Sequence, residues 1–97
     1  MVKDNKYISY IKSFFRINFP DYRVAKEATH GPFWHIEFTK DETRVTISGD
    51  IGFRIVIKLF DTEYPLWQYD RSIHDKSRTN IENINYQLLV LQSFLED

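Results

Sequence analysis

The chain has 97 residues, of which 42% are hydrophobic and 16% aromatic, with no cysteine and a formal net charge of −1. This length suits one domain, the many large apolar side chains exclude intrinsic disorder, and the lack of cysteine excludes a disulfide framework or a cysteine-ligated zinc site. No apolar run reaches the ~18 residues of a membrane span and no signal-peptide pattern follows Met1, so we expect a cytoplasmic protein with no membrane partner.

Charge is unevenly distributed along the chain. Residues 1–30 carry six basic and three acidic side chains, residues 31–60 carry four of each, and residues 61–97 carry three basic and seven acidic. This asymmetry favours contact between oppositely charged surfaces, either with another molecule or between the two ends of the chain itself.

The first predicted element is a helix over residues 5–18. Its polar stripe has helical spacing and consists of Ser9, Lys12, Ser13 and Arg16. Pro20 ends the helix. The apolar arc is wider than the ~100° that contact with one surface requires, so this helix needs cover beyond a sheet.

Four strands are predicted next, as an antiparallel meander. The first, over residues 22–29, alternates weakly and suits a sheet edge; the other three alternate clearly between apolar and polar side chains. A loop over residues 40–43 sets Ile36 opposite Ile47. A three-residue loop over residues 50–52, with its glycine in the left-handed position, sets Ile47 opposite Ile55. Both hairpins then keep their apolar side chains on one face.

The last third of the chain contains one more helix. Residues 61–77 show no sustained period, and a short fifth strand around Leu66–Tyr69 is one interpretation. Thr79 and Glu82 have the spacing of a capping box, and the helix after it has the core stripe Ile81, Ile84, Leu88, Leu91 and Leu95. The predicted fold class is therefore α+β, in the order α-β-β-β-β-α, with a four-stranded antiparallel meander sheet and both helices packed on one face.

Three basic residues are candidates for a binding site on the outer face of this sheet. The register places Arg44 directly opposite Lys58, with Arg54 nearby. A like-charge pair is unfavourable unless an anion lies between the side chains, so these residues predict a site for an anion or an acidic partner. The competing interpretation is that they are solvated, or neutralised by Asp61 or Glu63.

Two groups of apolar residues are candidate interfaces. Tyr64, Trp67 and Tyr69 lie in the irregular segment and are typical of interface hot spots. Their acidic flanks disfavour base stacking with nucleic acid, and the alternative is that they cover an open end of the core. A second stripe on the last helix is a candidate homodimer interface unless the first helix covers it; it consists of Tyr86, Val90 and Phe94.

Catalytic patterns are absent from the sequence. His30, His35 and His74 lack metal-ligand spacing, and no phosphate loop or nucleophile elbow occurs, so no catalytic residue, metal or cofactor is predicted. The expected function is that of a non-catalytic interaction or regulatory protein, which binds and in one version inhibits a protein partner. The predicted partner-binding set joins the aromatic residues, as anchors, to the basic residues, as a charged rim, and consists of Tyr64, Trp67, Tyr69, Arg44, Arg54 and Lys58. The alternatives are a nucleic-acid-binding module that uses the outer sheet face and a small metal-free hydrolase.

Overall fold

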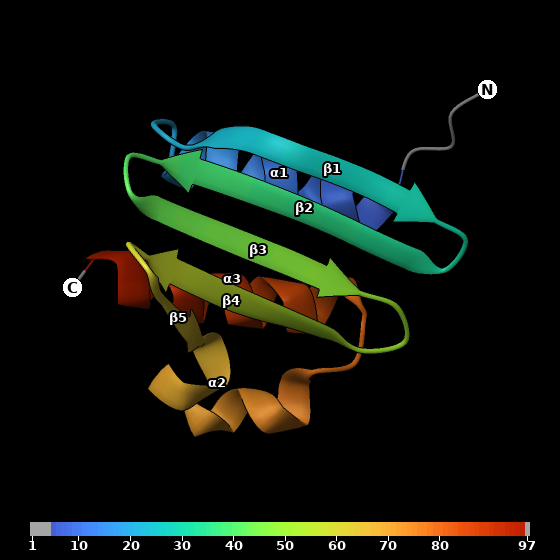
Figure 1. The fold of residues 1–97 in the computed structure, drawn as a ribbon. Helices are drawn as coiled ribbons and strands as arrows, with labels where there is room; N and C mark the ends of the chain where they lie inside the picture. Colours follow the sequence, from blue (N-terminus) through green and yellow to red (C-terminus); the bar gives the residue numbers. More distant parts are fainter. Residues whose placement is uncertain (1–4, 97) are drawn as a thin grey trace.

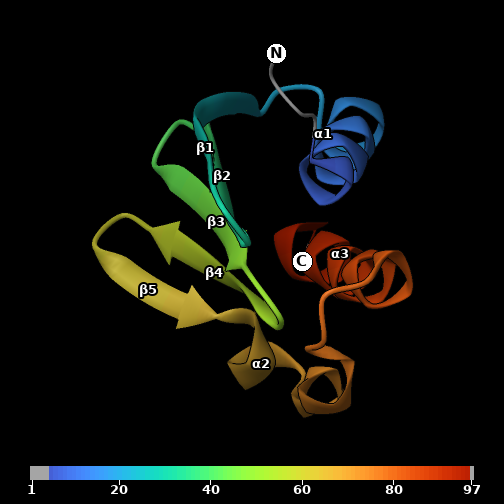
Figure 2. The same ribbon diagram turned by 90° about the vertical axis from the view of Figure 1, so that its right-hand side faces the viewer.

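The computed structural model describes residues 5–96, which form an antiparallel sheet with its long helices on one face (Figures 1 and 2). The sheet contains β1 (Arg23–His30), β2 (Phe33–Lys40), β3 (Thr43–Gly49), β4 (Phe53–Leu59) and β5 (Thr62–Pro65), which lie in chain order. The helices are α1 (Lys6–Asn18), α2 (Leu66–Tyr69), the 3-10 helix η1 (Arg71–Lys76) and α3 (Ile81–Glu96). The predicted α+β fold with both long helices on one face is confirmed, but the sheet has five strands rather than four.

The predicted register of the central sheet is confirmed. Ile36 lies opposite Ile47, and Ile47 lies opposite Ile55, so all three side chains are on the buried face. Because this row comes from three consecutive strands, a slip by one residue in any of them would turn its apolar side chains toward solvent. β1 is at the edge of the sheet, as its weak alternation predicted.

The fifth strand lies earlier than the sequence suggested. Thr62–Pro65 pairs with β4, whereas Leu66–Tyr69 forms the single helical turn α2. The turn before β5 requires a left-handed backbone at Phe60, whose φ is +56°, and a non-glycine residue in this region gives no sequence signal of a hairpin. Pro65 is tolerated because β5 is the other edge strand.

The prediction of a left-handed Gly52 is wrong. Residues 50–52 do form the predicted three-residue loop, because Gly49 pairs with Phe53, but among residues 5–96 the only glycine with positive φ is Gly31. The loop is fixed by other contacts. The Asp50 amide donates to the Gly52 carbonyl (2.8 Å), and the Thr79 amide donates to the carbonyl of Ile51 (2.9 Å).

The start of α3 also differs from the prediction. Asn80 is the capping residue, since its Oδ1 accepts a hydrogen bond from the amide of Asn83 (2.7 Å). Thr79 does not cap the helix, and its buried Oγ1 has no hydrogen-bond partner within residues 5–96. The reason is that the Thr79 backbone pairs with Ile51 and places this residue one position before the cap.

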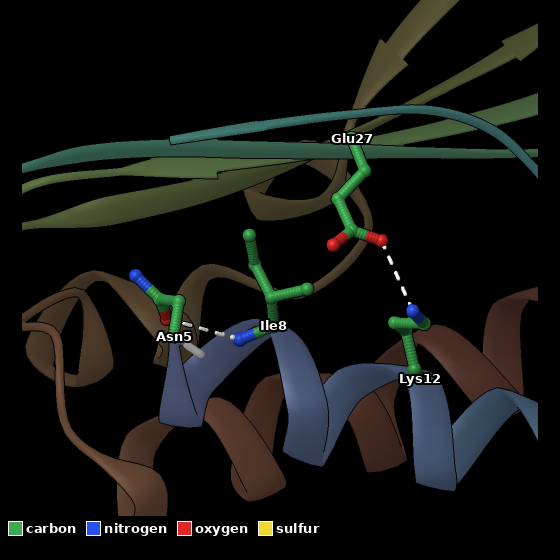
Figure 3. A network of polar contacts seen from close by, with 4 residues as sticks. All are labelled: Asn5, Ile8, Lys12 and Glu27. Carbon is green, nitrogen blue, oxygen red and sulfur yellow. Dashed lines mark hydrogen bonds and ion pairs between the residues drawn. The ribbon is translucent and has the colours of Figure 1, made fainter. Parts of the chain in front are cut away.

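The buried core lies between the inner sheet face and the two long helices. The Phe15 ring of α1 stacks on the Phe38 ring of β2, with centroids 3.7 Å apart and planes 2° from parallel. Asn5 caps α1 by accepting from the amides of residues 7 and 8, and Lys12 Nζ lies 3.1 Å from Glu27 Oε1 of β1 (Figure 3). Helix α1 therefore covers the β1 side of the sheet, and α3 covers the β4 side (Figure 2).

Candidate functional site

The three basic residues singled out in the sequence lie on the outer sheet face. Arg44 is directly opposite Lys58, as predicted, and Arg54 is opposite Ser48. Glu37 partly offsets this positive charge, because its Oε2 lies 3.9 Å from Arg44 Nε. Glu37 is on β2, on the other side of Arg44 from Lys58, and Glu63 of β5 lies directly opposite Lys58, as one competing interpretation of the sequence required.

Tyr64 and Tyr69 lie on the opposite side of the sheet from these basic residues. Tyr64 pairs with the buried Ile57, so its side chain is on the helix face, and its ring centroid is 6.4 Å from that of Phe94 in α3. Tyr69 meets the same Phe94 edge-on at 5.2 Å, and its hydroxyl is 3.2 Å from Ser93 Oγ. The six residues predicted as one partner-binding set therefore occupy two surfaces.

Trp67 occupies the outer side of the single-turn helix α2. Its neighbour Leu66 is fully buried and anchors α2 to the core, while the Trp67 side chain keeps 41% of its surface exposed. The indole ring packs against His74 of η1, with centroids 5.5 Å apart. Trp67 is thus fixed in orientation yet accessible to solvent.

The second apolar stripe of α3 is half-buried by its own chain. Phe94 contacts Tyr64 and Tyr69, and the Tyr86 hydroxyl lies 2.7 Å from Ser72 Oγ of η1. The cover comes from β5 and the segment after it, and not from α1, which approaches α3 on another side through a hydrogen bond from Tyr10. Val90 lies between these contacts and remains partly exposed.

A groove of about 570 Å³ runs between α2 and α3. We call it the α2–α3 groove; it is lined by Tyr69, Asp70, Tyr86, Leu89, Val90 and Ser93. Asp70 Oδ1 accepts hydrogen bonds from the hydroxyl (2.7 Å) and amide (2.9 Å) of Ser72, and these bonds lower the pKa of Asp70. The rim of an otherwise apolar groove therefore carries a negative charge at neutral pH.

Leu89 and Asp70 were not identified from the sequence. Leu89 is half exposed, whereas the neighbouring Leu88 and Leu91 are buried. The only sequence signal for it was the run of four apolar residues from Leu88 to Leu91, because consecutive helical residues cannot all face one buried surface. Asp70 looked like an ordinary flanking charge, because its role depends on the turn into η1.

Two of the three histidines line a common cleft on the outer sheet face. His30 and His35 both border it, whereas His74 packs on Trp67 elsewhere. Within residues 5–96, no group of three His, Asp or Glu side chains is placed to hold a metal ion, and no helix is long and apolar enough to cross a membrane. Comparisons with family models, with curated proteins and with solved structures found no match for this chain.

Proposed function

We propose that this chain is a non-catalytic binding protein whose partner is another protein, bound at the α2–α3 groove. The observation that supports this is the gathering of exposed apolar side chains at one hollow. Tyr69 and Leu89 expose 42% and 50% of their surface, and the half-buried Tyr86 and Val90 lie between them. Contiguous apolar surface of this kind is typical of protein interfaces, and tyrosine is enriched among the residues that dominate their affinity.

The charge at the groove indicates the chemistry of the partner. Asp70 lies on the rim, and residues 61–97 carry seven acidic side chains against three basic ones. A partner segment that inserts a large apolar side chain and carries lysine or arginine beside it would complement both features. In this proposal Tyr69 is an anchor and Trp67 extends the surface along α2. If the partner is an enzyme, occupation of its own site by this surface would inhibit it.

Affinity capture with matched variants tests the proposal. Leu89→Glu places a charge in the groove, while Ile17→Glu makes the same kind of change at a residue of α1 that is 75% exposed and outside the groove. We expect a protein that the wild type and Ile17→Glu both retain and that Leu89→Glu loses. With that protein purified, Leu89→Glu should weaken binding by at least about tenfold, because a desolvated, unpaired charge is costly.

Further measurements separate the proposal from its alternatives. If light scattering shows a dimer that Val90→Asp converts to a folded monomer, the groove is a homodimer interface instead. If the outer face binds oligonucleotides with an affinity that falls steeply with added salt, nucleic-acid binding replaces the proposal. Equal capture by the wild type, Leu89→Glu and Ile17→Glu would show that the groove has no protein partner.

A further inference from the structure

The β1–β2 and β3–β4 turns lie at the same end of the sheet (Figure 1). Residues beside both turns line a cleft on the outer sheet face. The cleft measures about 630 Å³. One cross-strand row lies across it, with neighbours paired in the order Ala28, His35, Ser48 and Arg54. Alanine and serine are small, so the row is low on both sides of His35, and the larger side chains that line the cleft form its walls.

The walls combine aromatic and polar side chains. Phe33 exposes 58% of its surface and is paired across the turn with His30, so two rings stand on the β1–β2 side. Ser77 lies on the opposite side and is held there because the Phe53 amide donates to its carbonyl (2.8 Å). Gly49 lies next to an outward-facing position of β3, so its backbone forms part of the floor of the cleft.

Several polar groups of the residues that line the cleft have unused hydrogen-bonding capacity. Within residues 5–96, neither the Arg54 guanidinium nor the Ser48 hydroxyl has an ion-pair or hydrogen-bond partner. Asp50 also borders the cleft, but its Oδ1 accepts a hydrogen bond from the Gly52 amide (3.3 Å) within its own turn. Across the strand from Ser48, His35 Nε2 has no hydrogen bond, and its nearest carboxylate oxygen is that of Glu37 at 3.9 Å.

We propose that this cleft binds a small organic anion in which an oxyanion group is attached to a planar ring. The ring would lie against Phe33 and His30, and its anionic oxygens would accept hydrogen bonds from Arg54 and Ser48. An arginine fork suits carboxylate and phosphate oxygens equally, so the shared chemistry is an oxyanion attached to a flat apolar body. The cleft volume is in the range of small-molecule sites.

Paired ligands test this proposal and distinguish the two oxyanions. We would follow the backbone amide resonances of Ser48, Gly49 and Arg54 during titration with adenosine monophosphate against adenosine, and with indole-3-acetate against indole-3-acetamide. We expect saturable shifts at these amides for at least one anion and much weaker binding of its neutral counterpart. The anion that binds identifies the oxyanion as phosphate or carboxylate. Equal binding of the neutral compound, or no binding of either anion at millimolar concentration, would overturn the proposal.

A pair of arginine variants provides the specificity control. Arg54→Gln should weaken binding of the anion about tenfold, as expected for loss of one charge-assisted interaction. Arg44→Gln removes the same charge from the same face outside the cleft and should leave the affinity within about twofold. Equal losses in both variants, or tighter binding of a single-stranded oligonucleotide than of the mononucleotide, would indicate an extended basic surface and refute a small-molecule site. The α2–α3 groove lies on the helix side, so either proposal can fail alone.

Discussion

Replacement of Gly49 by alanine should destabilise the protein more than replacement of either other glycine. A Cβ atom at position 49 would lie 2.6 Å from the Cβ of Phe53, 2.8 Å from Cζ2 of Trp34 and 2.9 Å from the carbonyl oxygen of Gly52. Carbon atoms in contact are normally about 3.5–4.0 Å apart, so the two carbon neighbours must move by roughly 1 Å, and the carbonyl oxygen is also too close to stay in place.

These neighbours cannot move easily. A Cβ atom and a carbonyl oxygen are fixed to the backbone, and the Trp34 indole is packed between the rings of Tyr7 and Phe53. Overpacking a core typically costs about 1–3 kcal/mol, and the rigidity of this site places Gly49→Ala near the upper end, at about 3 kcal/mol. For a domain of this size the melting temperature should fall by about 12–24 °C.

The two remaining glycines are internal controls. Gly31 has a φ of +58° with no atom within 4 Å of its added Cβ, so Gly31→Ala should cost only the roughly 1–2 kcal/mol of a left-handed alanine. Gly52→Ala has one tight contact, 3.2 Å from the carbonyl oxygen of Ser77, and should cost clearly less than Gly49→Ala because a shift of a few tenths of an ångström relieves it. Urea unfolding followed by tryptophan fluorescence measures all three. The packing argument is refuted if Gly49→Ala lies within about 1 kcal/mol of Gly52→Ala.

Two further predictions concern the polar contacts at the ends of short elements. Asn80→Ala should lower the free energy of unfolding by about 1 kcal/mol, because a helix cap is lost, whereas Thr79→Val should leave it unchanged or raise it, because an unpartnered buried hydroxyl is removed; urea unfolding that gives the reverse order would restore Thr79 as the cap. NMR titration of the Asp70 carboxyl should give a pKa below that of ordinary aspartate, rising in Ser72→Ala. Because the folded pKa is depressed, the Ser72 bonds stabilise the fold above the pKa of the unfolded state, and this contribution is lost as pH falls through the folded pKa; an unchanged pKa in Ser72→Ala would contradict the assignment.

The central sheet could be predicted because the same alternation of apolar and polar side chains recurs in three consecutive strands. Ile36, Ile47 and Ile55 each belong to a strand that alternates over several residues, and each hairpin independently sets the same apolar face. β5 and α2 offer no such repetition, since each is four residues long. A four-residue strand contains only two inward positions, and a single helical turn is too short for an apolar residue to recur at helical spacing, so neither element shows a period.

The candidate sites were predicted only as far as the sheet was. The register correctly set Arg44 opposite Lys58. The carboxylate near Arg44 belongs to Glu37, which is its diagonal neighbour on β2, and the sequence argument compared only residues directly opposite each other. Tyr64 could not be assigned to a face until β5 was known. For that reason the aromatic and basic residues were grouped on one surface, although the sheet separates them.

Individual hydrogen bonds fix the irregular segment between β5 and α3. The Gln87 side chain of α3 is buried and donates to the carbonyl of Lys76 (2.8 Å), and the carbonyl of Ser77 accepts from the Phe53 amide (2.8 Å). Near its start, this segment supplies Tyr69 to the α2–α3 groove, and near its end it supplies Ser77 to the outer-face cleft. Both candidate sites thus depend on contacts that occur once each. Periodicity cannot report such contacts, which is why this chain reveals its fold more readily than its function.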